Sequence, residues 1–389
     1  MGNQVPQSII RLFGPAPEPE SSLRRYRILA PLCPIRVSPI HLGTMSFGTA
    51  WDPHFGGVDR DAAFQVLDAY FAAGGNFLDC ANSYTDEQSE TIVGEWLQDR
   101  GVRDRMVIAT KFTLDYKFHQ HGKNQVVNYG GNSKVSMHLS LRDSLKKLQT
   151  DWIDIFYLHS WDYTSDIASI MDALHLLVQQ GKVLYLGISN APAWVVSAAN
   201  TYAKAQGKTP FSVYQGMYNV TQRDLENDII PMSQAMGLGV TAFGVLASGK
   251  LKNKSAIAER KRLGREVFRL LQSQSPAEED ACKALEAIAE ELKANAETVA
   301  IAWTMAKFPY VFPTIGIREP EQLQDVMKAI SLRLTPEHIT LLENSCPLTK
   351  PYPHSVLGGD AAQTGKLMAA LAAPATMDIV KTSKPISYE

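Results

Sequence analysis

The feature that most constrains the fold is a regular alternation of short apolar runs with longer segments of helical periodicity. Several of the runs are apolar without alternation, which is typical of parallel strands covered on both faces. Eight strands, each followed by a helix, predict an α/β fold, namely a closed (β/α)8 TIM barrel. A doubly wound open sheet is the alternative. The predicted strands lie at residues 40–44, 76–81, 106–111, 153–159, 183–189, 212–217, 239–244 and 311–316.

Amphipathic stripes predict helices between the strands, and serine, aspartate and glycine near their ends are typical boundary signals. The clearest stripes lie at residues 61–74, 133–150, 165–181 and 277–296.

Three segments depart from a minimal barrel. Residues 25–39 have the pattern of a hairpin that closes the bottom of the barrel, and residues 245–276 are too long for an ordinary connection. The end of the chain is rich in Pro, Gly and Ala and is expected to be irregular. We divide the chain into an N-terminal extension (1–25), a barrel (26–346) and a C-terminal tail (347–389).

Composition argues against several classes of partner. The net charge of -2 over 389 residues provides no electrostatic footprint for nucleic acid or an anionic membrane. No apolar run approaches the roughly 20 residues that a membrane-spanning helix needs. The four cysteines form no CxxC pair, a pattern typical of free thiols in a reducing compartment, so we expect a cytoplasmic protein with neither nucleic-acid nor membrane partners.

Polar or aromatic residues lie at the ends of six successive predicted strands. The carboxyl ends of parallel strands in a barrel meet at one face, where such enzymes place their chemistry. We therefore expect these side chains to gather at one mouth of the barrel. They are Asp79, Lys111, His159, Ser189 with Asn190, Gln215, and Phe243 with Gly244.

Tyr84 follows Asp79 by five residues, so the loop between them can return its phenol to the mouth. A phenol has a pKa of about 10 and is a reluctant acid. A lysine ammonium about 4 Å away favours phenolate by roughly 4 kcal/mol at an effective dielectric of about 20, or about three pKa units. Lys111 is positioned to supply this charge and Asp79 to keep it protonated. His159 is a candidate to orient a carbonyl oxygen or to share in proton transfer.

Each of these residues also has a structural interpretation. A buried histidine is usually a satisfied core residue, and an Asp–Lys pair is often a structural ion pair. Tyr84 alone is compatible with a loop anchor. Ser189 and Asn190 are also candidates to cap the helix expected near Pro192. Their joint placement at one face favours a function.

Two motifs carry no function in this interpretation. The nearest match to a GxGxxG fingerprint, at residues 237–242, leads into a strand instead of following one, so we interpret it as a tight helix-to-strand turn. His119 and His121 form an HxH pair with no third ligand at a recognisable spacing, so we expect no metal site.

Four separated motifs, in the right order, resemble those of the aldo-keto reductase superfamily from about Arg27 to Cys346. GGNFLDCANSY (74–84) resembles its signature around the catalytic Asp and Tyr, and IATK (108–111) and LHSWD (158–162) resemble the segments that carry its Lys and His. The resemblance implies a catalytic tetrad, with a tyrosine as general acid. We use the word tetrad for Asp79, Tyr84, Lys111 and His159.

The same resemblance implies an NADP(H) site. GISN (187–190) and YQGMYN (214–219) are similar to segments that hold the nicotinamide carboxamide. VTAFGVLASGKL (240–251) is similar to the segment that stacks on the nicotinamide and follows the pyrophosphate. PTIGIREPEQLQDVM (313–327) is similar to the segment that binds the 2'-phosphate and the adenine. One departure is Val326, where the family usually has Asn. The implied cofactor residues are Asp79, Ser189, Asn190, Gln215, Phe243, Gly244, Leu246, Ser248, Gly249, Lys250, Arg318, Gln322 and Asp325.

Within the superfamily, segments such as SLKKLQTDWIDIFYLHSWD and KTPFSVYQGMYN are similar to fungal aryl-alcohol dehydrogenases and norsolorinic acid reductase-type enzymes. This resemblance implies a small-molecule substrate, namely an aromatic aldehyde, ketone or benzylic alcohol, in secondary metabolism. Tyr84 and His159 are then substrate contacts, and four aromatic residues are candidates either for the substrate pocket or for ordinary packing under loops. These four are Trp51, Phe55, Tyr116 and Trp161.

Two other functions stay open. One is a barrel that binds NADPH as a non-catalytic sensor or partner-binding subunit. The other is a cofactor-free lyase in which Lys111 forms a Schiff base.

Overall fold

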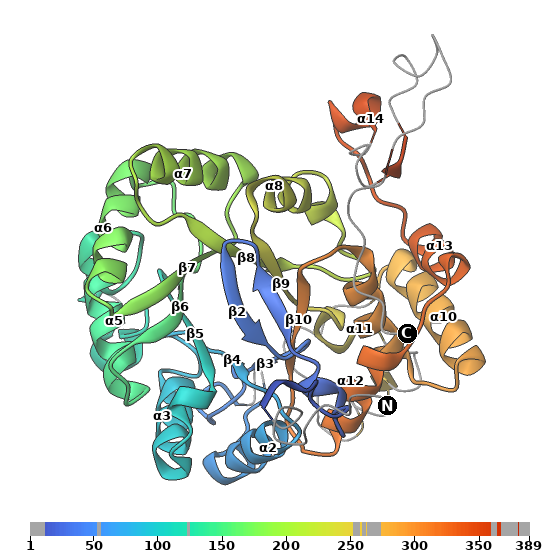
Figure 1. The fold of residues 1–389 in the computed structure, drawn as a ribbon, viewed down its shortest axis with the longest axis horizontal. Helices are drawn as coiled ribbons and strands as arrows, with labels where there is room; N and C mark the ends of the chain where they lie inside the picture. Colours follow the sequence, from blue (N-terminus) through green and yellow to red (C-terminus); the bar gives the residue numbers. More distant parts are fainter. Residues whose placement is uncertain are drawn as a thin grey trace, which may run out of the picture.

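Eight parallel strands form a closed barrel, which confirms the predicted fold (Figure 1). The structure is a computed structural model that describes residues 12–52, 56–122, 125–251, 257–258, 262, 274–358, 364–366 and 380. The barrel closes because β10 pairs with both β3 and β9. Its strands are β3 (His41–Gly43), β4 (Phe77–Asp79), β5 (Val107–Phe112), β6 (Ile153–Leu158), β7 (Val183–Ser189), β8 (Phe211–Met217), β9 (Gly239–Phe243) and β10 (Val311–Gly316).

Helices surround the barrel and include the four that were predicted, with ends within a few residues of the expected ones. The long helices are α2 (Arg60–Ala72), α3 (Gln88–Arg100), α5 (Lys134–Lys147), α6 (Ile167–Gln179), α7 (Ala193–Ala205), α8 (Ile229–Met236), α10 (Pro276–Glu291), α11 (Ala296–Lys307), α12 (Gln322–Ser331) and α13 (Pro336–Ser345).

Side-chain caps begin several of these helices. The Ser133 and Asp166 side chains accept hydrogen bonds from backbone N–H groups in the first turns of α5 and α6. Ser275 and Glu278 form a reciprocal capping box at the start of α10, with Pro276 in the first turn. Each cap satisfies donors that a helix start otherwise leaves without partners.

The predicted hairpin is formed by β1 (Arg27–Ala30) and β2 (Cys33–Val37), which pair antiparallel. It lies across one end of the barrel, coloured blue in Figure 1. Hairpin residues such as Leu29 and Val37 share one buried cluster with interior barrel residues such as Phe77 and Phe312. The hairpin therefore plugs the barrel interior, while a second and larger apolar cluster fills the layer between strands and helices.

The glycines at 237 and 239 belong to this plug, as the interpretation of that motif as a turn requires. Gly237 ends α8 in a left-handed conformation, with φ of 81°. Gly239 opens β9, and a Cβ there would lie 2.4 Å from the carbonyl oxygen of Leu29. Close approach of the hairpin backbone thus requires glycine, and since Gly239 is the first residue of its strand, the hairpin seals the amino-terminal end of the barrel.

The long connection after β9 begins with a single 3-10 turn, η5 (Ala247–Gly249), and ends where α10 starts. Residues 252–256, 259–261 and 263–273 lie outside the described residues, so the expectation for this connection concerns a segment that is mostly not described. In the tail, the described part contains the short helix α14 (His354–Leu357).

The described helices include none that is both long and apolar enough to cross a bilayer. All four cysteines are free thiols: Cys33, Cys80 and Cys282 are buried, and Cys346 is partly exposed.

His41, the first residue of β3, is fully buried near the sealed end of the barrel. Its ring stacks on Phe77, with 3.7 Å between ring centroids, and more distantly on Phe312. Neither ring nitrogen has a hydrogen-bond partner. Burial holds the pKa of His41 well below its ordinary value, and the nearby charge of Arg27 lowers it further. The folded protein therefore keeps this imidazole neutral.

This burial predicts an acid-sensitive contribution to stability. Unfolded histidine has a pKa of about 6.5, so below that pH the unfolded chain binds a proton that folded His41 does not. Stability is then lost as pH falls, by about 1.4 kcal/mol per pH unit from this group. We expect the His41→Leu variant to gain about 2 kcal/mol relative to wild type between pH 7 and pH 5, measured by urea unfolding. The same substitution at exposed His121 serves as control, and an equal pH slope in both variants would contradict this role of His41.

Candidate active site

The structure brings the four tetrad residues together at the carboxyl-terminal mouth of the barrel. Asp79 ends β4, Lys111 is the next-to-last residue of β5, His159 directly follows β6, and Tyr84 lies in the loop between β4 and α3. The Lys111 ammonium donates hydrogen bonds to Asp79 Oδ2 at 2.9 Å, to the Cys80 carbonyl oxygen at 2.6 Å and to the Tyr84 hydroxyl at 3.3 Å. The ring of His159 meets that of Tyr84 edge-on, with 5.9 Å between centroids.

Burial separates the phenol from the other three groups. Asp79, Lys111 and His159 are 3%, 0% and 8% exposed. Tyr84 alone keeps intermediate exposure. An incoming molecule therefore meets the phenol, while the charges that act on it stay shielded from water.

The ammonium of Lys111 stays charged in spite of its burial. Burial is the largest effect and lowers its pKa, but the negative charge of Asp79 and several smaller contributions together outweigh burial, and the pKa of Lys111 is raised. The hydrogen bond that Lys111 donates to Asp79 adds to the shift. The pair thus places a permanent positive charge beside the phenol oxygen.

The expected lowering of the Tyr84 pKa is wrong in sign. Burial of the phenol is the largest effect and raises its pKa, and the charge of Asp79 raises it further. Lys111 acts in the expected direction but does not outweigh burial, so the pKa of Tyr84 is above its ordinary value. The predicted lowering considered only the charge of Lys111 and left out the burial of the phenol. With this balance Tyr84 carries a proton at neutral pH, as a proton donor must.

His159 is neutral in this site. Burial is the main cause and the charge of Lys111 the second, and together they lower the pKa of His159 to about 3. Its Nδ1 is buried without a hydrogen-bond partner. A neutral imidazole can orient an oxygen through a hydrogen bond, but it cannot act as a charged acid at neutral pH.

Gln215, on β8, is part of the same cluster. Its Nε2 donates to Asp79 Oδ1 at 2.9 Å and to the Thr241 hydroxyl at 3.2 Å. Asp79 therefore receives Lys111 on one carboxylate oxygen and Gln215 on the other. Sequence reasoning placed Gln215 beside a cofactor but did not anticipate its contact with Asp79.

Ser189 and Asn190 do not cap the following helix, so this structural interpretation is wrong. The N-cap of α7 is Pro192, without a side-chain cap. Asn190, in a left-handed conformation with φ of 46°, donates from Nδ2 to the carbonyl oxygen of His159 at 3.1 Å. The hydroxyl of Ser189 is fully buried and has no hydrogen-bond partner. An unsatisfied buried hydroxyl at a strand end is suited to a polar ligand group.

The segment expected to follow the pyrophosphate leaves the end of β9. Phe243, its last residue, keeps partial exposure. Ala247 and Ser248 follow in left-handed conformations, with φ of 47° and 59°, which are uncommon for residues other than glycine. Lys250 lies 3.6 Å from the Glu278 carboxylate of α10, so its charge faces that helix. The remaining expected members, Gly244, Leu246 and Gly249, lie in the same short segment and keep partial exposure.

Arg318 reaches across the rim from β10 to the loop that follows β3. A Cβ placed on Gly56 of that loop would lie 2.5 Å from Arg318 Nη1. Gln322 is engaged locally, since its Oε1 accepts the backbone N–H of Arg318 at 2.9 Å. Asp325 pairs with exposed Lys328.

Val326 belongs to the apolar layer under α12 and is 7% exposed.

The aromatic candidates divide into two groups. Trp51 donates from Nε1 to Asp86 at 2.9 Å, close to Tyr84 in the chain. Trp161, two residues after His159, is 9% exposed, and its indole nitrogen has no partner. Tyr116 instead points toward α5, where its hydroxyl donates to Asp143 at 2.9 Å, so the substrate interpretation is not supported for it. Phe55 lies outside the described residues.

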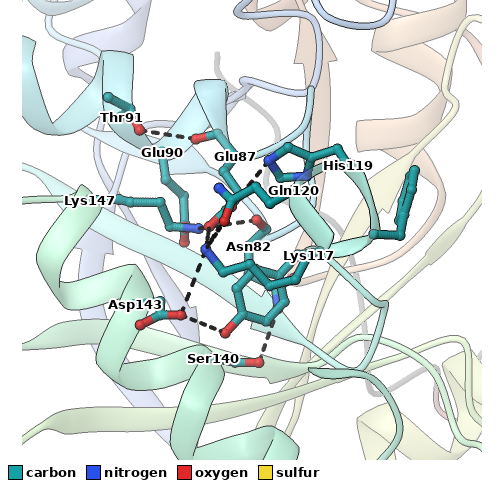
Figure 2. A network of polar contacts seen from close by, with 12 residues as sticks. Asn82, Glu87, Glu90, Thr91, Lys117, His119, Gln120, Ser140, Asp143 and Lys147 are labelled. Carbon is teal, nitrogen blue, oxygen red and sulfur yellow. Dashed lines mark hydrogen bonds and ion pairs between the residues drawn. The ribbon is translucent and has the colours of Figure 1, made fainter. Parts of the chain in front are cut away.

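Sequence reasoning missed the contacts that hold the loops of this site. Asn132 and Asp162 bind each other reciprocally: each backbone N–H donates to the other side chain, at 2.7 Å and 2.9 Å. This pair joins the loops after β5 and β6 beside Trp161. A second group surrounds Glu87 and is shown in Figure 2. These partners lie some thirty residues or more apart, so no local spacing indicates them.

His119 of the HxH pair lies 3.5 Å from the Glu87 carboxylate. Among the described residues, no three His, Cys, Asp or Glu side chains are grouped as a metal site requires.

Comparisons with known proteins agree with this geometry. A model described as the aldo/keto reductase family matches residues 39–345. The aldo-keto reductase ausK of Aspergillus calidoustus is 52% identical over 382 residues, which cover 98% of this chain and 96% of that protein. An aryl-alcohol dehydrogenase of Phanerodontia chrysosporium, whose name specifies NADP(+), is 48% identical, with 90% and 93% covered. Norsolorinic acid reductase B of Aspergillus parasiticus is 42% identical, with 88% and 90% covered.

The buried pair of Asp79 and Lys111 predicts a large stability effect. Removing one partner of a buried ion pair leaves an uncompensated charge and costs about 3–5 kcal/mol. We expect Asp79→Asn to lower the free energy of unfolding by this amount, measured by urea denaturation. Asp68→Asn, which breaks the exposed pair of Asp68 with Arg100, is the control and should have a far smaller effect.

A further variant, Asp79→Asn combined with Lys111→Met, should recover much of the lost stability, since no unpaired charge remains. If Asp79→Asn unfolds at the same urea concentration as wild type, the carboxylate is not what sustains the buried ammonium.

Proposed function

Since the chain belongs to the aldo/keto reductase family and is an oxidoreductase, we propose that it interconverts aldehydes or ketones with their alcohols, using NADPH and Tyr84 as the general acid. The proposal assigns catalysis to Asp79, Tyr84, Lys111 and His159. One observation carries it: a single buried ammonium contacts both the Asp79 carboxylate and the hydroxyl of Tyr84, and of the four residues Tyr84 alone has intermediate exposure.

The rim of the barrel fits a nicotinamide dinucleotide. The buried hydroxyl of Ser189 lacks a partner, as expected of a group that binds the carboxamide. Asn190 directly follows Ser189 at the end of β7, and Gln215 lies near the end of the neighbouring strand β8. Partly exposed Phe243 offers a ring for stacking. Arg318 is the cation for a 2'-phosphate, since a phosphate dianion is well matched by a guanidinium.

The segment from Gly244 to Lys250 would follow the pyrophosphate, and Gln322 and Asp325 would lie toward the adenine. The bound cofactor supplies the hydride, and the residues of the chain supply position and charge.

The proton step follows from the geometry of the tetrad. A carbonyl oxygen that gains negative charge takes the proton from the Tyr84 hydroxyl. The Lys111 ammonium, 3.3 Å from that hydroxyl, stabilises the phenolate that remains. Asp79 keeps the ammonium charged, and neutral His159 holds the carbonyl oxygen by a hydrogen bond. Alcohol oxidation is the reverse, with the phenolate as base.

For the substrate we propose an aromatic aldehyde, ketone or benzylic alcohol. Support comes from the relatives whose names specify aryl-alcohol dehydrogenase and norsolorinic acid reductase. Trp161 lies two residues after His159, and Trp51 donates a hydrogen bond to Asp86, two residues after Tyr84, so we assign the contact with an aromatic ring to them. We further propose that the reaction belongs to fungal secondary metabolism, as the resemblance to norsolorinic acid reductase-type enzymes implies.

The raised pKa of Lys111 argues against a Schiff-base lyase. Such a lysine must lose its proton to attack a carbonyl, whereas Asp79 favours the ammonium here. A non-catalytic NADPH sensor needs none of the charge arrangement around Tyr84. Turnover of a panel of aromatic aldehydes with NADPH separates the two functions, since a sensor binds the cofactor without oxidising it.

The Tyr84→Phe variant tests the proton donor. We expect kcat for carbonyl reduction to fall about 10²–10⁴-fold, the usual contribution of a positioned acid, while NADPH still binds. Turnover is followed by NADPH absorbance and binding by fluorescence titration. Tyr26→Phe, at the hairpin end of the barrel, is the matched control. Wild-type turnover in Tyr84→Phe would remove Tyr84 from its role.

The Arg318→Ala variant tests the preference for NADPH. Loss of a charged hydrogen bond to the 2'-phosphate should weaken NADPH binding about ten- to hundredfold and leave NADH binding nearly unchanged. Lys283→Ala removes an exposed cation of α10, which pairs with Asp280, and should affect neither cofactor. Equal losses for NADPH and NADH would show that Arg318 does not select the phosphate.

A further inference from the structure

The three residues that follow the proposed proton donor form a strained turn. Thr85, Asp86 and Glu87 have φ values of 50°, 50° and 74°, and none is glycine. L-residues adopt the left-handed region reluctantly, and such conformations persist where the surroundings fix them, often at active sites. This turn, which we call the Thr85–Glu87 turn, connects Tyr84 directly to α3.

Each residue of the turn has its side chain anchored to another part of the chain. The Thr85 hydroxyl donates to the carbonyl oxygen of Met45 at 2.7 Å. The Asp86 carboxylate accepts the indole N–H of Trp51 at 2.9 Å. These two contacts fasten the turn to the loop after β3, and Glu87 fastens it on the side of α5.

Glu87 is the most heavily bonded of the three (Figure 2). Its carboxylate receives the Lys117 ammonium at 2.8 Å, the Lys147 ammonium at 2.9 Å and the Gln120 amide at 3.0 Å. The side chains of Glu87, Lys117 and Lys147 are 8%, 15% and 12% exposed. Both ammonium groups also lie about 5 Å from the ring centroid of Tyr116. The contact of Glu87 with the two lysines is mostly buried, so it differs from exposed ion pairs, which contribute little to stability.

Lys147 extends the contact on both sides of Tyr84. Besides Glu87, it donates to the carbonyl oxygen of Asn82 at 3.2 Å and lies 2.8 Å from the Glu90 carboxylate. The backbone N–H of Asn82 also donates a hydrogen bond to the carbonyl oxygen of Lys111. The backbone before and after Tyr84 is therefore held by one lysine, which Glu87 and Glu90 keep in place.

We propose that Glu87 is a positioning residue, which holds the strained Thr85–Glu87 turn and thereby sets the phenol of Tyr84 against Lys111 and the substrate. The inference rests on the proposed function, because it matters only if Tyr84 donates the proton. Glu87 itself contacts neither the phenol of Tyr84 nor the ammonium of Lys111. It acts through the backbone, by binding the ammonium groups of Lys117 and Lys147, which both lie about 5 Å from the ring centroid of Tyr116.

Two pairs of variants separate charge from strain. Glu87→Gln removes the charge at constant size, and Glu95→Gln makes the same change on α3, where half-buried Glu95 pairs with Arg60. Glu87→Ala and Glu87→Gly both remove the carboxylate, but only glycine adopts a φ of 74° without strain. Folding of each variant is checked by thermal unfolding.

The measurements are kcat with an aromatic aldehyde, the NADPH dissociation constant, and the isotope effect on kcat with NADPH deuterated at the transferred position. We expect kcat to fall about ten- to hundredfold in Glu87→Gln and Glu87→Ala, as for a small misplacement of a catalytic group. Glu87→Gly should retain more activity than Glu87→Ala. NADPH binding should be unchanged, because the residues assigned to the cofactor lie mainly on the β7–β10 side of the barrel.

The isotope effect distinguishes positioning from mere loss of folded enzyme. A misplaced phenol slows the chemical step, so the isotope effect should rise in Glu87→Gln, whereas a smaller active fraction lowers kcat and leaves it unchanged. If the Glu87 variants match Glu95→Gln in kcat and isotope effect while Tyr84→Phe is inactive, the positioning proposal is overturned and the proposed function stands. Full activity of Tyr84→Phe would overturn both.

Discussion

The active centre depends on keeping one ammonium charged where no water reaches it. Lys111 is fully buried, and its charge is compatible with that position because the Asp79 carboxylate lies 2.9 Å away and the Cys80 carbonyl oxygen accepts a further hydrogen bond. Asp79 is in turn held by Gln215 from the opposite side of the barrel. Because an unpaired charge would be costly here, the three strands that carry these residues must meet at fixed distances. The closed barrel provides that constraint.

The two ends of the barrel serve different purposes. The amino-terminal end is sealed by the hairpin of β1 and β2, with Gly239 allowing close approach and His41 stacked inside. The buried cluster that joins the hairpin to the barrel interior is apolar and contributes to stability. The carboxyl-terminal end carries buried polar groups with unused hydrogen-bonding capacity, among them Ser189, His159 Nδ1 and the indole of Trp161. Unsatisfied groups lower stability, and their grouping at one rim is what a ligand site requires.

Electrostatics and backbone strain meet at Tyr84. Burial raises the pKa of the phenol and Lys111 opposes this, and the net result is a raised pKa that keeps Tyr84 protonated at neutral pH. The following turn holds three residues in left-handed conformations, which only contacts from other loops can maintain. Placing a phenol at a barrel mouth thus draws on residues more than sixty positions away, such as Lys147. The site is a property of several loops together.

The sequence alone determined the barrel, the order of its strands, the hairpin and the gathering of Asp79, Tyr84, Lys111 and His159 at one mouth, because apolar periodicity and residues at strand ends are local signals along the chain. Only the tertiary structure decided the sign of the Tyr84 pKa shift, the contact between Gln215 and Asp79, and the position of Tyr116 away from the mouth. It also revealed the Glu87 contacts. These depend on burial and on distances between side chains from separate loops, and neither quantity is encoded by spacing along the chain.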